Sequence, residues 1–311
     1  MSPMRQPVMT PSDGLPQRVR IWEVGPRDGL QNEATVISSG VKIAFIDRLS
    51  DAGVPVIEAT SFVRPDRVPQ LADGATVMAG ITRKPGVRYP VLVPNLRGLE
   101  SAVASDARDI AVFASATESF AQRNLGRSLV DQMSMFEPVL ASASSRGIPV
   151  RGYVSMCFGD PWEGAVDPSG VVDVCWQLLS AGCSDISLGD TIGVATPGQV
   201  RTLIGLLERR GVELDRIGVH FHDTYGQALS NTLAALQCGV TTVDASTGGL
   251  GGCPYAESAT GNLATEDLVW MLDGLGIETG VDLEKLVETS IWLARYLGKP
   301  ISSRVTQALS Q

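Results

Sequence analysis

The stretch Ser169–Asp190, SGVVDVCWQLLSAGCSDISLGD, places a helical pattern directly before a strand. Apolar residues recur at helical spacing over Ser169–Ala181, Gly182 favours the left-handed conformation that ends a helix, and Asp185–Leu188 is a short strand-like run. The order of helix, glycine and strand recurs at Ala52-Gly53-Val54, Arg146-Gly147-Ile148 and Cys238-Gly239-Val240. Such a repeated unit predicts an α/β fold with a parallel sheet.

The whole chain contains eight short runs of strand type that Gly, Pro or Asp bounds. They are Val19–Val24, Val54–Ala59, Tyr89–Val93, Ile110–Ala114, Val150–Ser155, Asp185–Leu188, Ile217–Phe221 and Thr242–Ala245. Helical patterns lie between them, for example at Val41–Asp51, Leu129–Arg146, Ser169–Ala181, Pro197–Arg210 and Gln227–Gly239. Eight alternating units predict a closed (β/α)8 TIM barrel, with an open doubly wound sheet as the alternative.

The same pattern predicts the domain organisation. No change in composition marks a linker, so residues 19–311 are expected to form a single barrel domain. Residues 1–18 are polar and rich in proline, and they are expected to be a flexible N-terminal lead. The segment Gly261–Gly298 supplies more helix than eight units need, which predicts a C-terminal helical extension.

The composition limits the classes of partner. Hydrophobic residues make up 44% and charged residues 19% of the 311 residues, as in a globular protein. Lys and Arg total 25 against 34 Asp and Glu, and the net charge of −9 argues against nucleic acid or membrane partners. No apolar run is long enough to cross a bilayer, and no secretory signal is evident. Five cysteines without a C-x-x-C pair argue against a disulfide framework, so a cytoplasmic location is expected.

The two histidines of the chain, His220 and His222, lie two residues apart at the end of the seventh predicted strand. Because side chains i and i+2 of a strand point to the same face, both imidazoles can bind one metal ion. Asp28 and Asn262 are candidates for two further oxygen ligands. This mixed donor set favours Mg²⁺ or Mn²⁺, whereas the alternative is a pair of hydrogen-bonded core histidines.

Two more candidates lie at the C-terminal ends of predicted strands, where the active sites of TIM barrels are found. Arg27 follows the first strand, and its guanidinium is expected to stabilise a developing oxyanion. The alternative for Arg27 and its neighbour Asp28 is an ordinary surface ion pair. Glu58 interrupts an apolar run, and a buried carboxylate there would be costly unless it is paired or used in catalysis.

A glycine-rich stretch follows the eighth predicted strand. Its flexibility predicts a mobile loop that covers the site and contains Gly248, Gly249, Gly251 and Gly252. It is not a dinucleotide-binding motif, because Pro254 stands where that pattern requires glycine. Cys253 on this loop is a candidate for proton transfer, with a small buried apolar residue as the alternative.

Five motifs resemble those of the 3-hydroxy-3-methylglutaryl-CoA lyase family, and the resemblance runs from about Val19 to Val305. The motifs are Gly25–Asn32 (GPRDGLQN), Ile57–Val63 (IEATSFV), Ser187–Gly193 (SLGDTIG), His220–Gln227 (HFHDTYGQ) and Gly249–Ala256 (GLGGCPYA). They are long and occur in the family's order, so the resemblance is specific.

The resemblance implies a TIM-barrel metallolyase that cleaves 3-hydroxy-3-methylglutaryl-CoA into acetyl-CoA and acetoacetate, and it also implies a homodimer. It assigns the divalent cation to Asp28, His220, His222 and Asn262. It assigns further roles to Arg27 at the enolate oxygen, Cys253 as acid and base, Glu58 as a supporting residue and Asp190 as base or orienter.

Three loops depart from the family pattern. Asp66–Gln70 lacks the family's tryptophan, Asn124-Leu125-Gly126 replaces Asn-Ile-Asn, and Asp160–Gly164 replaces Cys-Pro-Tyr-Glu-Gly. Because all three are expected on the active-site face, cleavage of another 3-hydroxy-acyl-CoA is an alternative. A Claisen-type synthase would share the Arg-Asp and His-x-His motifs but typically lacks the Cys-Pro loop. A non-catalytic metal-binding barrel is the alternative from a different class.

Overall fold

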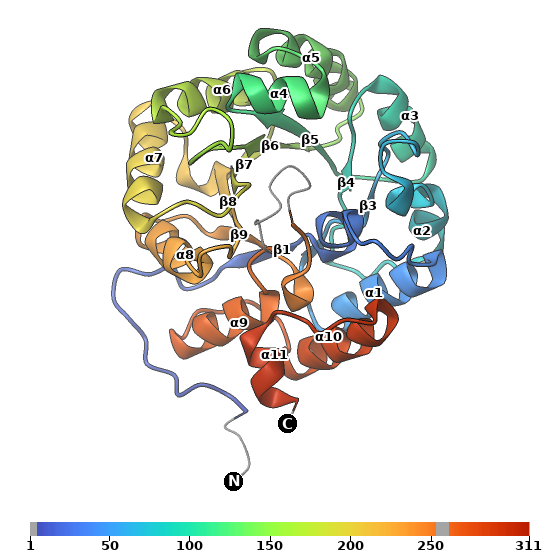
Figure 1. Cartoon of the computed structure of the whole chain (residues 1–311), viewed down its shortest axis with the longest axis vertical. Helices are drawn as coiled ribbons and strands as arrows, with labels where there is room; N and C mark the ends of the chain where they lie inside the picture. Colours follow the sequence, from blue (N-terminus) through green and yellow to red (C-terminus); the bar gives the residue numbers. More distant parts are fainter. Residues whose placement is uncertain (1–4, 253–260, 311) are drawn as a thin grey trace.

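The computed structural model describes residues 5–252 and 261–310, and Figure 1 shows its strands at the centre of a ring of helices. The strands of these described residues form one parallel sheet with the order β2-β1-β9-β8-β7-β6-β5-β4-β3. Their bounds are β1 Arg20–Glu23, β2 Val56–Ile57, β3 Thr60–Ser61, β4 Val91–Leu92, β5 Ile110–Ser115, β6 Val150–Ser155, β7 Asp185–Asp190, β8 Ile217–Phe221 and β9 Thr242–Ala245.

The sheet closes on itself through the second predicted strand. In the structure this run continues beyond its predicted end at Ala59 to Ser61, and Glu58 and Ala59 divide it into β2 and β3, so the two ends of the strand order are consecutive in the chain. The dividing residues still bond to both neighbours. The N–H of Glu58 donates to the Glu23 carbonyl at 2.8 Å, and the N–H of Ala59 donates to the Pro90 carbonyl at 2.9 Å. The predicted closed TIM barrel and its eight strands are confirmed, and the open-sheet alternative is wrong.

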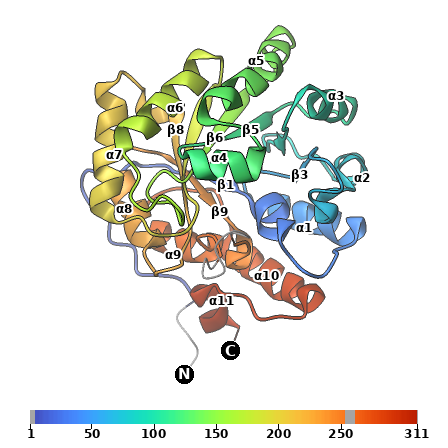
Figure 2. The same ribbon diagram turned by 45° about the horizontal axis from the view of Figure 1, so that its top comes forward.

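The helices cover the outside of the barrel, as the turned view in Figure 2 also shows. Their bounds are α1 Ser39–Asp51, α2 Gly74–Gly80, α3 Leu96–Ala104, α4 Glu118–Leu125, α5 Leu129–Ser145, α6 Pro168–Ser180, α7 Pro197–Arg209, α8 Ala228–Gln237, α9 Thr265–Gly274, α10 Leu283–Leu297 and α11 Arg304–Leu309. Short helical turns lie at η1 Gly25–Gly29, η2 Pro69–Leu71, η3 Leu214–Arg216 and η4 Thr247–Gly249. Within the described ranges, none of the helices is long and apolar enough to span a membrane.

Arg151 on β6 is buried inside the barrel. The guanidinium of Arg151 lies 4.0 Å from the centre of the Trp22 ring and donates to Asp244 on β9 at 2.8 Å. A charge in an apolar interior is tolerated only when it is paired, and here the ion pair and the aromatic face provide that compensation. The strands β1, β6 and β9 are thereby tied together across the barrel.

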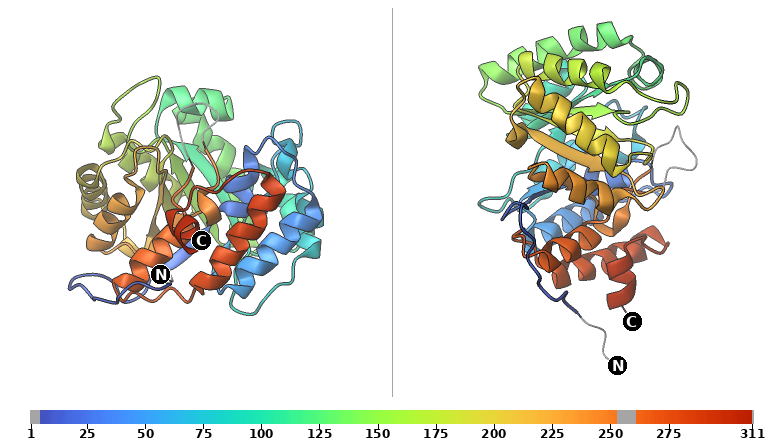
Figure 3. Two further views of the ribbon diagram at one scale, coloured as in Figure 1. Left: turned by 60° about the horizontal axis from the view of Figure 1, so that its bottom comes forward. Right: turned by 90° about the vertical axis from the view of Figure 1, so that its left-hand side faces the viewer.

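The C-terminal helices extend beyond the eight units. The helix α9 follows β9 and completes the eighth unit, whereas α10 and α11 are additional, and Figure 3 shows α10 beside α1. Residues 5–18, predicted to be a flexible lead, pass the C-terminal end of α9, where the N–H of Thr10 donates to the Gly274 carbonyl at 2.7 Å. At the end of this segment, Arg18 and Glu278 form an exposed ion pair at 2.8 Å.

We expect Gly53→Ala to lower the free energy of unfolding by about 1–3 kcal/mol. Gly53 has a φ of 85°, and a Cβ at this position would lie 2.3 Å from the Gly280 carbonyl oxygen. Urea unfolding measures the change. The control is Gly86→Ala, which has a similar φ of 82° but no atom within 4 Å of its Cβ. Equal losses in the two variants would show that the contact with Gly280 contributes nothing.

Candidate active site and metal centre

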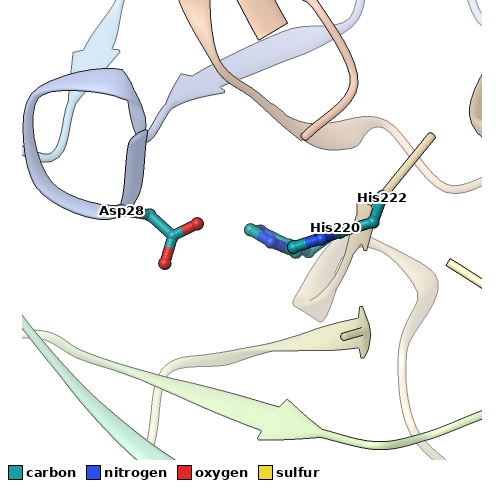
Figure 4. Close-up of side chains that lie close together, drawn as sticks. All are labelled: Asp28, His220 and His222. Carbon is teal, nitrogen blue, oxygen red and sulfur yellow. The ribbon is translucent and has the colours of Figure 1, made fainter. Parts of the chain in front are cut away.

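Three side chains that are distant in sequence meet at the C-terminal mouth of the barrel. Asp28 lies in η1 directly after β1, His220 lies in β8, and His222 follows that strand. Each offers one ligand atom, and these atoms lie within 4.8 Å of one another. Figure 4 shows the carboxylate of Asp28 facing the two imidazole rings. The predicted convergence of these three residues is therefore present in the structure.

The orientation of His220 is set by a buried carboxylate. Its Nδ1 lies 3.3 Å from Oδ2 of Asp244, which also accepts a hydrogen bond from the Ser187 hydroxyl at 2.8 Å. Burial alone would lower the pKa of His220, but the hydrogen bond with Asp244 and the negative charges of Asp28 and Asp244 raise it. A carboxylate that binds one ring nitrogen leaves the other, Nε2, for a metal ion, which is the usual arrangement of a metal-binding histidine.

Asn262 meets the requirements of a fourth ligand. Its Nδ2 donates to Asp28 Oδ2 at 2.8 Å and to the Leu250 carbonyl at 2.9 Å. Its Oδ1 is buried and has no hydrogen-bond partner among the described residues. A buried amide oxygen without a donor is unfavourable unless another group binds it, and a hard cation is such a group. The donor set of the chain therefore fits a divalent cation.

Asp28 is ready to bind a cation because it is ionised. Burial would raise its pKa, but the positive charge of Arg27 and the nearby imidazoles of His220 and His222 lower the pKa to about 2. Nη1 of Arg27 donates to Asp28 Oδ1 at 2.6 Å. The side chain of Arg27 is only 8% exposed, so the alternative of a surface ion pair is wrong.

Arg27 also binds Glu58, and both are buried. Nη2 of Arg27 donates to Glu58 Oε2 at 2.8 Å, and the same oxygen accepts the hydroxyl of Tyr153 at 2.9 Å. Burial raises the pKa of Glu58, whereas the charge and hydrogen bond of Arg27 act in the opposite direction. Glu58 is thus paired, and it fixes the guanidinium beside Asp28.

Asp190 forms a structural contact at the end of β7. Its two carboxyl oxygens accept the N–H groups of Val194 and Ala195 at 2.9 and 3.1 Å, which fixes the turn before α7. Burial raises the pKa of Asp190 to about 6, although these backbone hydrogen bonds oppose the shift. Its role as base or orienter remains a prediction.

The glycine-rich segment is described only as far as Gly252. Positive φ angles of 72°, 68° and 116° occur at Gly248, Gly249 and Gly251, where a side chain would be strained. A Cβ on Gly251 would also lie 2.3 Å from Asn262 Nδ2, so this glycine permits the close approach of the proposed ligand. Cys253 lies outside the described residues, and its role and the mobility of the loop remain predictions.

Two residues of the site were not identified from the sequence. Asp244 orients His220, and Tyr153 binds Glu58. Asp244 carries the same signal that singled out Glu58, namely one acidic residue within an apolar strand. Tyr153 carries no such signal, because an aromatic residue in a strand is ordinary.

A half-buried carboxylate and two buried imidazoles that could hold one metal ion, at the C-terminal mouth of a TIM barrel, are the arrangement of a metal-dependent enzyme. The chain matches the HMGL-like family model over residues 18–292 and belongs to this family.

Similar proteins cover nearly the whole chain. The human protein named hydroxymethylglutaryl-CoA lyase, mitochondrial, is 53% identical over 302 residues, which are 97% of this chain and 93% of that protein. The crystal structure of hydroxymethylglutaryl-CoA lyase from Pseudomonas aeruginosa has a TM-score of 0.93 at 49% identity and covers 96% of this chain and 99% of its own. The structure of an HMG-CoA lyase from Acinetobacter baumannii, in complex with coenzyme A and 3-methylmalate, has a TM-score of 0.90 at 35% identity. The match covers 96% of this chain and 97% of that one.

We expect Asp244→Asn to weaken Mn²⁺ binding by about 10- to 100-fold, as is typical when the carboxylate behind a metal-binding histidine is removed. Titration of the folded protein with Mn²⁺ by electron paramagnetic resonance measures the dissociation constant. Ser187→Ala is the control, because it removes a hydrogen bond to the same oxygen of Asp244 but keeps the carboxylate. An unchanged dissociation constant in Asp244→Asn would show that Asp244 does not orient His220 for metal binding.

Proposed function

We propose that this protein is a divalent-metal-dependent carbon–carbon lyase that cleaves 3-hydroxy-3-methylglutaryl-CoA into acetyl-CoA and acetoacetate. The observation that carries the proposal is the cluster of Asp28, His220, His222 and Asn262 with the buried guanidinium of Arg27 beside it. Relatives named as this lyase and a related structure that contains coenzyme A support the reaction and the acyl-CoA substrate.

The reaction makes three chemical demands. The 3-hydroxyl group loses its proton, the bond between C2 and C3 breaks as the ketone of acetoacetate forms, and the enolate of acetyl-CoA takes up a proton at C2. The cation held by Asp28, His220, His222 and Asn262, Mg²⁺ or Mn²⁺, supplies a positive charge that makes the substrate hydroxyl more acidic. The chain itself must supply the remaining stabilisation and the proton.

Arg27 provides a fixed positive charge for the enolate. Its guanidinium is buried, and Glu58 and Asp28 hold two of its nitrogens. A donor that is already oriented in a water-poor site stabilises a developing negative charge without the cost of reorganisation. Glu58 is a positioning residue in this mechanism, because it binds Arg27 and Tyr153. Cys253 is proposed from the sequence as the group that gives the proton to C2.

The loops at the mouth favour one alternative, the same cleavage of a different 3-hydroxy-acyl-CoA. Trp162, which stands in a loop that departs from the family pattern, stacks on Phe120 with ring centres 6.5 Å apart. The guanidinium of Arg123 lies 4.3 Å from the centre of the Trp162 ring. These contacts join the departing loop Asp160–Gly164 to α4, whose C-terminal end leads into the departing segment Asn124–Gly126.

Several further features are part of the proposal. Residues 19–311 act as a single catalytic domain, the protein is a homodimer, and its location is cytoplasmic. The continuous barrel supports the single domain, and the family resemblance supports the homodimer. The composition of the chain supports the cytoplasmic location.

We expect purified protein loaded with Mg²⁺ or Mn²⁺ to release acetoacetate from 3-hydroxy-3-methylglutaryl-CoA, and His222→Ala to lose both this activity and Mn²⁺ affinity. Acetoacetate is measured enzymatically, and kcat/KM is compared with that for other 3-hydroxy-acyl-CoA substrates. A higher kcat/KM for one of those substrates would favour the alternative. Mn²⁺ binding without turnover of any acyl-CoA in the presence of dithiothreitol would indicate the non-catalytic barrel.

We expect Arg27→Gln to lower kcat by about 10²- to 10³-fold, the usual effect of removing one donor to a developing oxyanion. KM should change much less, because the charge that Arg27 stabilises is absent from the ground state. Steady-state kinetics at saturating Mn²⁺ measure both constants. A rise in KM at an unchanged kcat would mean that Arg27 only binds the substrate.

A further inference from the structure

A carboxylic acid that the mechanism does not use lies beneath the glycine-rich segment. Glu266 is the second residue of α9 and is completely buried. Both of its carboxyl oxygens lie 3.0 Å from the backbone nitrogen of Gly248, and one of them is also hydrogen-bonded to the hydroxyl of Ser290 on α10. The side chain therefore connects η4, α9 and α10 at one point.

Gly248 is held from its other side by the C-terminal segment. The N–H of Ser302 donates to the Gly248 carbonyl at 3.1 Å. A Cβ on Gly248 would lie 2.4 Å from Cγ2 of Ile301, so the backbone of Gly248 and the side chain of Ile301 are in close contact. With Glu266 on one side and these residues on the other, the peptide groups of Gly248 have little freedom to move.

Gly248 is linked to Asn262 through Leu250. Two residues after Gly248, the Leu250 carbonyl accepts the Asn262 Nδ2 at 2.9 Å. Because Nδ2 points at this carbonyl and at Asp28, the buried Oδ1 is the atom of the amide that is left for a cation. A displacement of the η4 backbone would rotate the amide and move this oxygen.

The charged groups that face Glu266 are all acidic. Glu23 contributes from β1 and Asp267 from α9, whereas Gly248 and Ser290 bring no formal charge. Within the described residues, no Lys, Arg or His forms an ion pair with Glu266. Burial raises the pKa of Glu266 to about 8, the charges of Glu23 and Asp267 add to the shift, and the backbone hydrogen bonds oppose it. At pH 7 the carboxyl is therefore mostly neutral.

We propose that Glu266 is a positioning residue for metal binding, because it holds the backbone of Gly248 and thereby fixes the Leu250 carbonyl that orients Asn262. This inference rests on the proposed function only in taking Asn262 as a metal ligand. Glu266 touches neither the cation nor the substrate. It acts through the Gly248 N–H, the Leu250 carbonyl and the side chain of Asn262.

The test compares Glu266→Gln and Glu266→Ala with the wild-type protein at pH 7 and pH 9, with the Mn²⁺ dissociation constant measured under argon. At pH 7 the Gln variant should bind within about twofold of wild type, because glutamine reproduces the size of the neutral acid, whereas the Ala variant should bind about tenfold more weakly. The ionised carboxylate can still accept the N–H of Gly248 and the hydroxyl of Ser290, so between pH 7 and pH 9 the Mn²⁺ affinities of the wild-type protein and the Gln variant should change alike.

A second measurement reports on Glu266 without any metal. The folded-state pKa is raised, so the stabilisation from the protonated acid is complete below the unfolded pKa and is lost as the pH rises to about 8. The melting temperature of Glu266→Gln minus that of wild type should therefore increase from pH 5 to pH 8. A constant difference would overturn the neutral state of Glu266.

Other variants keep the inference testable if Glu266→Ala does not fold. Ser290→Ala removes one partner of Glu266 and should weaken Mn²⁺ binding, whereas Ser50→Ala, a buried hydroxyl on α1, should leave it unchanged. Unchanged Mn²⁺ affinity in folded Glu266→Ala, or in Ser290→Ala when the former does not fold, would overturn the inference and leave the proposed lyase intact. A wild-type protein that binds no Mn²⁺ would instead overturn the metal centre itself, and this inference with it.

Discussion

The arrangement of the site depends on the pairing of buried charges, and above all on the guanidinium of Arg27. Asp28 and Glu58 each accept one of its N–H groups, at 2.6 and 2.8 Å. Without this cation, two carboxylates would share a water-poor site, and one of them would be expected to take up a proton. With it, Asp28 stays ionised and can bind a metal ion, and the guanidinium is itself fixed. In the proposed mechanism, one interaction therefore prepares both the cation site and the stabilisation of the enolate.

Arg151 is a second buried arginine that is paired with a carboxylate inside the barrel. Arg151 pairs with Asp244, which in turn binds the imidazole of His220. Both guanidiniums lie near the ring of Tyr153, whose centre is 5.4 Å from that of Arg27 and 5.3 Å from that of Arg151. Because an aromatic face attracts cations, this ring lets two like charges occupy one interior. The imidazole that Asp244 holds is thereby anchored to a rigid part of the fold.

The sequence predicted the barrel and the convergence of Asp28, His220 and His222, because both follow from local patterns. Strand runs such as Ile217–Phe221 are recognisable by themselves, and the spacing of His220 and His222 already places two rings on one face. The orientation of those rings was not predictable, since Arg151 and Asp244 are 93 residues apart and no local signal pairs them. The division of the second strand at Glu58 was likewise invisible, because it depends on bonds to Glu23 and Pro90 in two neighbouring strands.

The C-terminal extension has a physical reason in the last loop. Gly248, Gly249 and Gly251 adopt positive φ, which glycine tolerates because it has no side chain. For the same reason, these residues have nothing that could pack and fix the backbone. A segment of this kind can hold a metal ligand in place only if its neighbours supply the contacts. Those contacts come from Glu266 of α9, which Ser290 of α10 binds in turn, and from Ser302 in the turn before α11. Eight βα units alone would end at α9, and this backbone would lack the contacts that depend on Ser290 and Ser302. The additional helices are therefore part of the site, although no residue of α10 or α11 is proposed to touch the substrate.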